Sequence, residues 1–233
     1  MRINRLHGWQ VSIAEAKALQ LELAVQVIKT GEVAAPRFIA GADISRPDAA
    51  GIATAAMVVL SYPELKVVET QVVRDKLDFP YVPGLLSFRE SPLVLAASEK
   101  LVITPDLFIV DGHGYAHPRR MGYACHLGLF WDTPTIGCAK SLLCGRYEMP
   151  GDEPGSHTEI VDKGEVIGAA LRTKTGVKPI FVSIGHKISL ENAVYWAMKC
   201  CRGYRVPEPT RLAHLAAAGN LEEDMAVSAS HRL

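Results

Sequence analysis

The sequence predicts an α/β fold in which a mixed sheet, an antiparallel meander followed by parallel strands, is flanked by helices. Three β-rich runs follow one another between residues 37 and 74. Short apolar runs then alternate with helical patterns along the rest of the chain. Two of the apolar runs end in an aspartate. Strands that first form a meander and then alternate with helices give one mixed sheet with helices on its faces.

The first elements are an amphipathic helix and the meander. Residues 11–30 repeat apolar positions at helical spacing and stop at Gly31, so we predict a helix there. Strands are predicted at residues 37–45, 52–62 and 65–74. Residues 79–84 contain two prolines and a glycine, which indicates a rigid loop.

The second half of the sheet is predicted from alternating patterns. Residues 85–101 are expected to be helical beyond Pro92, with Glu90 on the turn that leads into the helix. PDLFIVDGHG predicts a central strand ending at the glycine-flanked Asp111. Further elements are a helix around Met121–Phe130, strands at 133–139, Glu165–Leu171 and Lys178–Ser183, and a helix at Ser189–Cys201 opened by a serine cap. The absence of repeats and linkers predicts one domain over residues 1–233, with a loose tail after Leu221.

Composition restricts the class of protein. Of 233 residues, 48% are hydrophobic and 21% charged, as in ordinary globular proteins. The five cysteines form no CxxC pair, which argues against a disulfide framework and favours a reducing compartment. No signal-like run opens the chain, and no stretch approaches the roughly 20 apolar residues that cross a bilayer. We therefore expect a cytoplasmic protein with no membrane partner.

Charge is balanced overall but uneven along the chain. The formal net charge is zero, yet residues 172–211 contain eight basic residues against two acidic ones. Such a segment can form a basic face that holds phosphates. A solvated helix face is the simpler interpretation from charge alone.

Three acidic residues form a candidate metal site. Asp43 ends the apolar run IAGAD and Asp111 ends LFIVD, while Glu90 precedes a predicted helix. Carboxylates at neighbouring buried strand ends repel each other unless a cation bridges them. Oxygen ligands without thiolates favour Mg²⁺ or Mn²⁺ over zinc. Each acid alone is better explained as a turn cap, but the three together have the layout of a nuclease site.

Longer sequence blocks around these acids resemble a known family. FPYVPGLLSFRESP, PDLFIVDGHGYAHPRRMGYACHLGL and TPTIGCAKSLLCG resemble the signature blocks of endonuclease V, and a looser similarity continues to PEPTRLAH. The resemblance implies an RNase H-like fold and a Mg²⁺-dependent nuclease, with Mn²⁺ as a substitute. It further implies cleavage of DNA on the 3′ side of a deaminated purine such as inosine, leaving a 3′-hydroxyl and a 5′-phosphate. We expect a monomer.

The resemblance also implies roles for individual residues. Asp43, Glu90 and Asp111 match the metal-binding acids, Lys140 the catalytic-site lysine and His214 an active-site histidine. A DNA wedge is implied at Pro80, Tyr81, Val82 and Pro83. A pocket for the flipped base is implied at Gly84, Gly112, His117, Gly122 and Leu143. Two prolines stiffen the wedge loop, and Tyr81 can stack where a base has left the duplex. Without the resemblance, this loop is equally well a turn with a packed aromatic residue.

Other residues and functions stay open. Arg119 and Arg120 are expected to contact phosphate or to be solvated, and His113 and His186 are weaker candidates for the site. Helical spacing assigns Met121, Cys125 and Leu129 to the core. The alternatives to a deoxyribonuclease are an inosine-specific endoribonuclease with the same metal site and a non-catalytic binder of damaged nucleic acid. The three intact acids argue against the binder.

Overall fold

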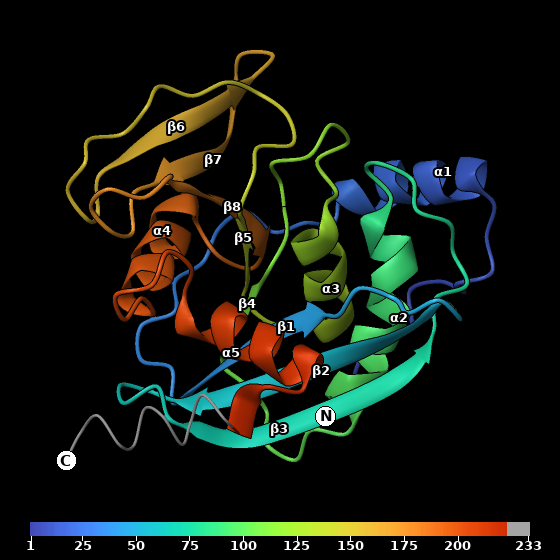
Figure 1. The fold of residues 1–233 in the computed structure, drawn as a ribbon. Coiled ribbons are helices and arrows are strands. Elements are labelled where there is room, and N and C mark those ends of the chain that lie inside the picture. Colours follow the sequence, from blue (N-terminus) through green and yellow to red (C-terminus); the bar gives the residue numbers. More distant parts are fainter. Residues whose placement is uncertain (223–233) are drawn as a thin grey trace.

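The computed structural model describes residues 1–222, and these form an eight-stranded sheet with helices on both faces (Figure 1). The strands are β1 (Phe38–Ile44), β2 (Ile52–Ser61), β3 (Val67–Lys76), β4 (Leu107–Val110), β5 (Thr135–Ala139), β6 (His157–Asp162), β7 (Glu165–Leu171) and β8 (Ile180–His186). Their order across the sheet is β3-β2-β1-β4-β5-β8-β7-β6. The three central strands β1, β4 and β5 are parallel, and the neighbours on either side pair antiparallel. The predicted mixed sheet and its opening meander are thus confirmed.

Helices cover the two faces of the sheet separately. They are α1 (Ile13–Ala24), α2 (Leu86–Glu99), α3 (Tyr123–Trp131), α4 (Leu190–Lys199) and α5 (Glu208–Ala218). In Figure 1, α2 and α3 lie on one side of the sheet while α4 and α5 lie on the other. Side chains alternate along β1 in the same way. Ala40 packs with the α2 and α3 residues, and Ile39 packs with Trp196 of α4.

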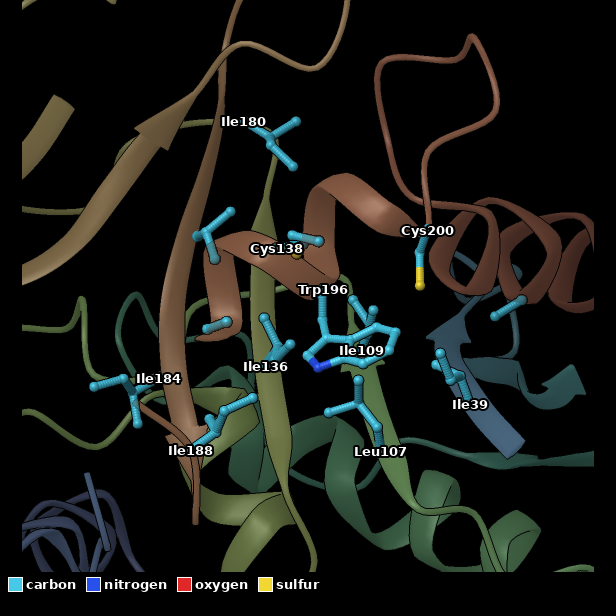
Figure 2. Close-up of a cluster of buried hydrophobic side chains, with 14 of the residues drawn as sticks. Ile39, Leu107, Ile109, Ile136, Cys138, Ile180, Ile184, Ile188, Trp196 and Cys200 are labelled. Atoms are coloured by element: carbon cyan, nitrogen blue, oxygen red, sulfur yellow. The ribbon is translucent and has the colours of Figure 1, made fainter. Parts of the chain in front are cut away.

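The core on the α4 side is built around Trp196. Figure 2 shows this indole beside Leu107 and Ile109 of β4 and Ile136 of β5, all of which are almost fully buried. Burial of each such side chain stabilises the fold by roughly 1.5–3 kcal/mol relative to exposure. The central parallel strands, which carry the two aspartates at their ends, are therefore held rigidly.

Helix α1 begins as expected but is shorter than expected. Ser12 and Glu15 form a capping box, with reciprocal hydrogen bonds between side chain and backbone. The predicted helix over 11–30 is wrong beyond Ala24. The main-chain oxygens of Ile28 and Gly31 instead accept hydrogen bonds from the loop that follows β8. Backbone hydrogen bonds to this distant loop thus take the place of the helical hydrogen bonds expected up to residue 30.

Helix α2 begins earlier than expected. It begins at Leu86 and contains Pro92, so Glu90 lies within a helix and not on a turn before it. Proline removes one backbone hydrogen bond from a helix interior. Buried Phe88 and Val94 anchor the helix on both sides of that position, and their packing outweighs the lost bond. Glu90 is therefore carried by a rigid element.

Two described elements were not predicted, and one prediction lies outside the structure. Strand β6 is mostly polar, and it joins β7 through Lys163 and Gly164, whose φ values of 55° and 81° suit a tight hairpin turn. Helix α5 follows Pro207 and ends at Gly219. The predicted loose tail begins after Leu221, and nearly all of it, residues 223–233, lies outside the described residues. Within residues 1–222, no helix is long and apolar enough to cross a membrane.

Candidate active site

The sheet brings Asp43 and Asp111 together at its centre. Strands β1 and β4 are parallel neighbours, and Ala42 pairs with Val110. Asp43 and Asp111 are the next residue on each strand, so their backbones lie about one strand spacing apart, roughly 4.8 Å. Their side chains are only 14% and 17% exposed. Two largely shielded acids thus lie side by side at the ends of the central strands.

Glu90 completes the acidic cluster from helix α2. Burial raises the pKa of Glu90 to about 8, and the negative charges of Asp43 and Asp111 contribute to that rise. Burial also raises the pKa of Asp43, with repulsion from Asp111 as the second cause. These carboxyl groups destabilise one another's charged forms in a poorly solvated place. The cluster therefore has a deficit of positive charge.

Two further predicted residues partly offset that deficit. Lys140 follows β5 directly, and its Nζ donates a hydrogen bond to Oδ2 of Asp111. The Lys140 carbonyl is fixed in turn by the guanidinium of Arg205, which donates to it at 2.7 Å. His214 of α5 places its Nδ1 2.8 Å from Oδ2 of Asp43. One basic side chain thus contacts each strand-end aspartate.

The approach of α5 depends on Gly41. A Cβ atom at this position of β1 would lie 1.9 Å from the main-chain oxygen of Pro209, in the first turn of α5. Only glycine lets the helix backbone come so close to the strand. His214 lies further along the same helix, and this close packing carries it to Asp43.

The residues suit a hard divalent cation. Within residues 1–222, no three acidic, histidine or cysteine side chains are arranged as a metal cage in this conformation. The donor chemistry nevertheless fits Mg²⁺ or Mn²⁺, because Asp43, Glu90 and Asp111 offer only carboxylate oxygens. Burial and mutual repulsion still raise the pKa values of Asp43 and Glu90 although Lys140 and His214 contact the aspartates, so a bound cation would further stabilise the ionised carboxylates.

A cavity of about 340 Å³ opens beside the acidic cluster. All five residues predicted for a base pocket line it: Gly84, Gly112, His117, Gly122 and Leu143. Asp111 and Lys140 belong to the same wall. The volume lies in the usual range for pockets that bind small ligands, which is about 300–1,000 Å³. The pocket and the cluster are therefore parts of one site.

The predicted wedge forms the rim of this cavity. Tyr81, Val82 and Pro83 line it, and Tyr81 is 71% exposed. Pro80 differs, because it borders a neighbouring cavity of about 360 Å³ together with Arg89. The Arg89 guanidinium donates to the main-chain oxygen of Phe79, which fixes the start of the loop. An exposed aromatic ring thus projects from a tethered loop.

Three arginines of the basic segment 172–211 are engaged in contacts within the protein and do not contribute to an open basic face. Arg172 donates hydrogen bonds to the main-chain oxygens of residues 150, 151 and 177, and Arg205 to those of 140, 178 and 179. Arg211 pairs with Glu208. Arg205 thus holds the segment that carries Lys140, whereas Arg172 stabilises other loops and Arg211 pairs within α5. The sequence alone cannot distinguish them from phosphate-binding cations.

The weaker candidates also have structural partners. Arg120 forms ion pairs with Asp162 and Glu165, so it is neither solvated nor directed at a phosphate. His113 is bonded through Nε2 to the main-chain oxygen of Ser141, on the loop that lines the cavity. His186 is buried and accepts a hydrogen bond from the Ile28 N–H, which explains why it takes no part in the site.

The residues predicted for the core lie there. Met121, Cys125 and Leu129 are buried in the large cluster that Trp196 shares.

Two residues of the site had no clear sequence signal. Gln20 of α1 is 1% exposed and lines the cavity. Tyr123 is 4% exposed, and its hydroxyl has no hydrogen-bond partner among the described residues. Burial, followed by the charge of Glu90, raises the pKa of Tyr123 well above its usual value. A buried polar residue inside an apolar helix pattern was the only hint that the sequence offered for Gln20.

A mixed sheet that gathers acids at the ends of two parallel strands, with a lysine and a base-sized pocket beside them, defines an α/β nuclease. The family model described as endonuclease V matches residues 21–215. The chain therefore belongs to the endonuclease V family. Membership also confirms the RNase H-like architecture expected from the sequence blocks.

Individual relatives are similar to this protein over nearly the whole chain, in sequence and in structure. Endonuclease V of Gloeobacter violaceus is 52% identical over 214 residues, which are 90% of this chain and 86% of that protein. The crystal structure of endonuclease V from Streptomyces avermitilis matches with a TM-score of 0.87 at 40% identity, covering 97% of this chain and 100% of that one. Endonuclease V of Ciona intestinalis, in complex with a 24-mer DNA containing an inosine followed by a ribo-adenosine, matches with a TM-score of 0.77 at 34% identity, covering 91% and 98%.

Proposed function

We propose that this nuclease recognises a deaminated purine, inosine above all, in DNA and hydrolyses a phosphodiester bond on its 3′ side. The products are a 3′-hydroxyl and a 5′-phosphate. The cofactor is Mg²⁺, for which Mn²⁺ substitutes. We further propose that the protein acts as a monomer in the repair of damaged DNA.

One observation carries the proposal: a single cavity is lined by the exposed Tyr81 rim, by the pocket glycines and by Asp111. A base that has left the duplex can enter the cavity while Tyr81 stacks in the space it vacated. The strand continues past Asp111 and Lys140. The residues that would recognise the lesion thus lie next to the residues that would cleave the strand.

The chain's own groups have distinct tasks in cleavage. Asp43, Glu90 and Asp111 would hold the cation, and its chemistry when bound would be to activate water and to stabilise the leaving oxygen. Lys140 gives up its hydrogen bond with Asp111 to hold the scissile phosphate or a water as a point charge. His214 orients Asp43 through their hydrogen bond. Phosphodiester hydrolysis is extremely slow without catalysis, so the site must supply strong charge stabilisation.

The experiment compares three matched strands in a duplex, with inosine, adenosine or guanosine at one position. We expect a Mg²⁺-dependent nick on the 3′ side of inosine only. Equal cleavage of all three strands, or an inosine nick that survives Asp43→Ala, would refute the proposal. Chemical analysis of the nick ends tests the product assignment.

A ribonucleotide substrate is the second candidate, and one observation favours it. The Ciona intestinalis relative was crystallised with DNA whose inosine is followed by a ribo-adenosine. The 2′-hydroxyl is the only group that differs at such a position. Inosine strands in all-deoxy, all-ribo and single-ribo form therefore separate the two activities by their kcat/KM values.

The third candidate is a non-catalytic binder of damaged nucleic acid, and its behaviour in a binding assay would differ from that of a nuclease. It would bind an inosine duplex equally in EDTA and in Mg²⁺, and it would not cleave at any metal concentration. The intact acidic cluster and its raised carboxyl pKa values speak against this class, because a pure binder has no use for clustered buried acids.

A further inference from the structure

The side chain of Gln20 joins three segments around the base pocket. It is 1% exposed. Its Nε2 donates to the main-chain oxygens of Gly84 at 3.0 Å and Met121 at 2.9 Å. Its Oε1 accepts from Nε of Arg119 at 2.6 Å. Both amide hydrogens and the carbonyl of this buried side chain are thus used.

The carbonyl of Gly84 is the common acceptor of this network. Besides Gln20, it accepts from Nη2 of Arg119 at 2.8 Å and from Nε2 of His117 at 3.0 Å. Nδ1 of His117 accepts from the Arg119 N–H at 3.1 Å, so the imidazole is neutral and carries its hydrogen on Nε2. Burial lowers the pKa of His117 to about 4, in agreement with that state. These donors and acceptors are compatible with one tautomer of His117 and one orientation of the Gln20 amide.

Two peptide planes that frame the pocket are fixed by these contacts. In the Met121–Gly122 peptide, the carbonyl accepts from Gln20 and the Gly122 N–H donates to Gly114 at 3.0 Å. In the Gly84–Leu85 peptide, the carbonyl accepts from Gln20 and the Leu85 N–H donates to Val82 at 2.9 Å. Gly84 itself has φ +79°, a conformation that glycine adopts readily because it has no Cβ atom. The Gln20 side chain therefore restrains the backbone at Gly84 and at Met121, on two sides of the pocket.

We propose that Gln20 is a positioning residue that sets lesion specificity by holding the wedge loop and the loop before α3 at a fixed separation. This rests on the proposed inosine-directed function. A flat base gains most from a slot that is already formed, because no loop needs to be ordered when it binds. A loosened slot binds the correct base more weakly and rejects other bases less well. Gln20 acts through Gly84 and Met121 and has no part in the hydrolytic step.

Two variants separate positioning from folding. In Gln20→Glu, the carboxylate keeps the contact with Arg119 but, when ionised, cannot donate to either carbonyl. In Gln20→Leu, all three bonds are lost. The matched control is Leu23→Ala, a buried position on the same helix that does not line the cavity. Thermal unfolding of each variant measures its stability independently of activity.

The decisive readouts are KM, kcat and the ratio of kcat/KM for inosine over adenosine strands. We expect both Gln20 variants to raise KM for the inosine strand about tenfold or more, the scale of one buried hydrogen bond left unmade. The kcat at saturation should stay within about threefold, because the acids are untouched. The inosine-to-adenosine ratio should fall in both Gln20 variants and stay at the wild-type value in Leu23→Ala.

The outcomes separate this inference from the proposed function. If the wild type does not discriminate inosine, the proposed function fails. If the wild type discriminates and the Gln20 variants discriminate equally, only the role of Gln20 is overturned. That role is also overturned if Leu23→Ala lowers the ratio as much as the Gln20 variants do. Should Gln20→Leu fail to fold, Gln20→Glu decides alone, because it retains the Arg119 contact.

Discussion

Nδ1 of His214 lies 2.8 Å from Oδ2 of Asp43, although 171 positions separate the two residues in the chain. The contact joins the last described helix to the first strand of the sheet. It exists because Gly41 lets α5 lie directly on β1. An imidazole N–H in this position orients the carboxylate oxygens and leaves the remaining lone pairs of Asp43 available for a cation.

Removal of this contact should slow cleavage without abolishing it. The His214 side chain is 60% exposed, so water partly replaces the lost hydrogen bond. We expect His214→Ala to lower kcat about tenfold, in line with a single solvent-screened bond to a charged group. Single-turnover cleavage of an inosine duplex measures this. His157→Ala, an exposed histidine on β6, is the control. A loss above about a thousandfold, the scale of a group acting in the transition state, would mean that His214 takes part in the chemical step itself.

Loss of a strand-end aspartate should abolish cleavage and spare lesion binding. Asp43→Ala or Asp111→Ala removes a carboxylate at the centre of the cluster, and we expect cleavage to fall by about a thousandfold or more. Asp43 does not line the cavity, and in Asp111→Ala the rim at Tyr81 and the five residues assigned to the base pocket are unchanged. Binding of an inosine duplex, followed by fluorescence anisotropy, should stay within about threefold of wild type. A variant that loses binding and cleavage together would contradict this division of labour.

Loss of the exposed tyrosine of the wedge should weaken lesion binding and largely spare the rate of cleavage, the reverse of the aspartate variants. Stacking of a base on an aromatic ring contributes about 1–3 kcal/mol, so we expect Tyr81→Ala to weaken binding of the inosine duplex roughly fivefold to a hundredfold. The cleavage rate at saturation should change much less. Tyr195→Ala is the control, because Tyr195 is 49% exposed on α4 and lies outside the cavity. Equal lesion affinity for wild type and Tyr81→Ala would remove the wedge assignment.

Binding of Mg²⁺ should release protons at neutral pH. The pKa of Glu90 is raised to about 8, so the metal-free protein holds this carboxyl mostly protonated at neutral pH. A cation stabilises the ionised form and lowers the pKa. Calorimetric titrations with Mg²⁺ in buffers of different ionisation enthalpy should report a net proton release. In Glu90→Gln the release should drop sharply, and an unchanged release there would place the proton elsewhere.

Acid should destabilise the fold through His126. Its ring is fully buried against His7, with 2.7 Å between their Nε2 atoms, and burial lowers its pKa to about 3. Nδ1 of His7 is bonded to the carbonyl of Gly8 and so carries a hydrogen, which makes His126 the donor between the rings. The folded pKa of about 3 is below the unfolded value of about 6.5, so this stability is present above about pH 6.5 and lost as the pH falls towards the folded pKa.

The size of this effect can be measured. Linkage gives a loss of about 2 kcal/mol in the free energy of unfolding between about pH 7 and about pH 5. Urea unfolding at the two pH values should show it in the wild type. In His126→Phe, which keeps an aromatic ring in the same cluster, the difference between the two pH values should shrink. A difference as large as in the wild type would assign the acid sensitivity to other groups.

The sequence predicted those features that depend on local pattern. Apolar runs bounded by turn residues identified the strands of the meander and the strand that ends at Asp111, because a short buried run of this kind has few alternatives. The rigid loop containing Tyr81 could be predicted from its two prolines. The sequence predicts Glu90 as a site residue, and it lies beside the two aspartates, but the local pattern predicts it on a turn and not within a helix. Pro92 made the helix look interrupted, and only the packing of Phe88 and Val94 overrides that local signal.

Tertiary structure alone decided how these pieces meet. Neither the His214–Asp43 contact nor the Lys140–Asp111 contact can be derived from spacing. The first depends on the packing of α5 on β1, and the second on the pairing of β4 with β5. The charge pattern of the basic segment allows a solvated helix face or a phosphate-binding face, yet two of its arginines bond to loop carbonyls that only the fold brings near them. Gln20 carried no motif, because its role arises from two backbone carbonyls far away in the chain. The sequence by itself determined most of the elements and the chemical groups of the acidic cluster, since both depend on residues close together in the chain. Distances between groups on different elements are set by long-range packing, and only the folded structure fixes them.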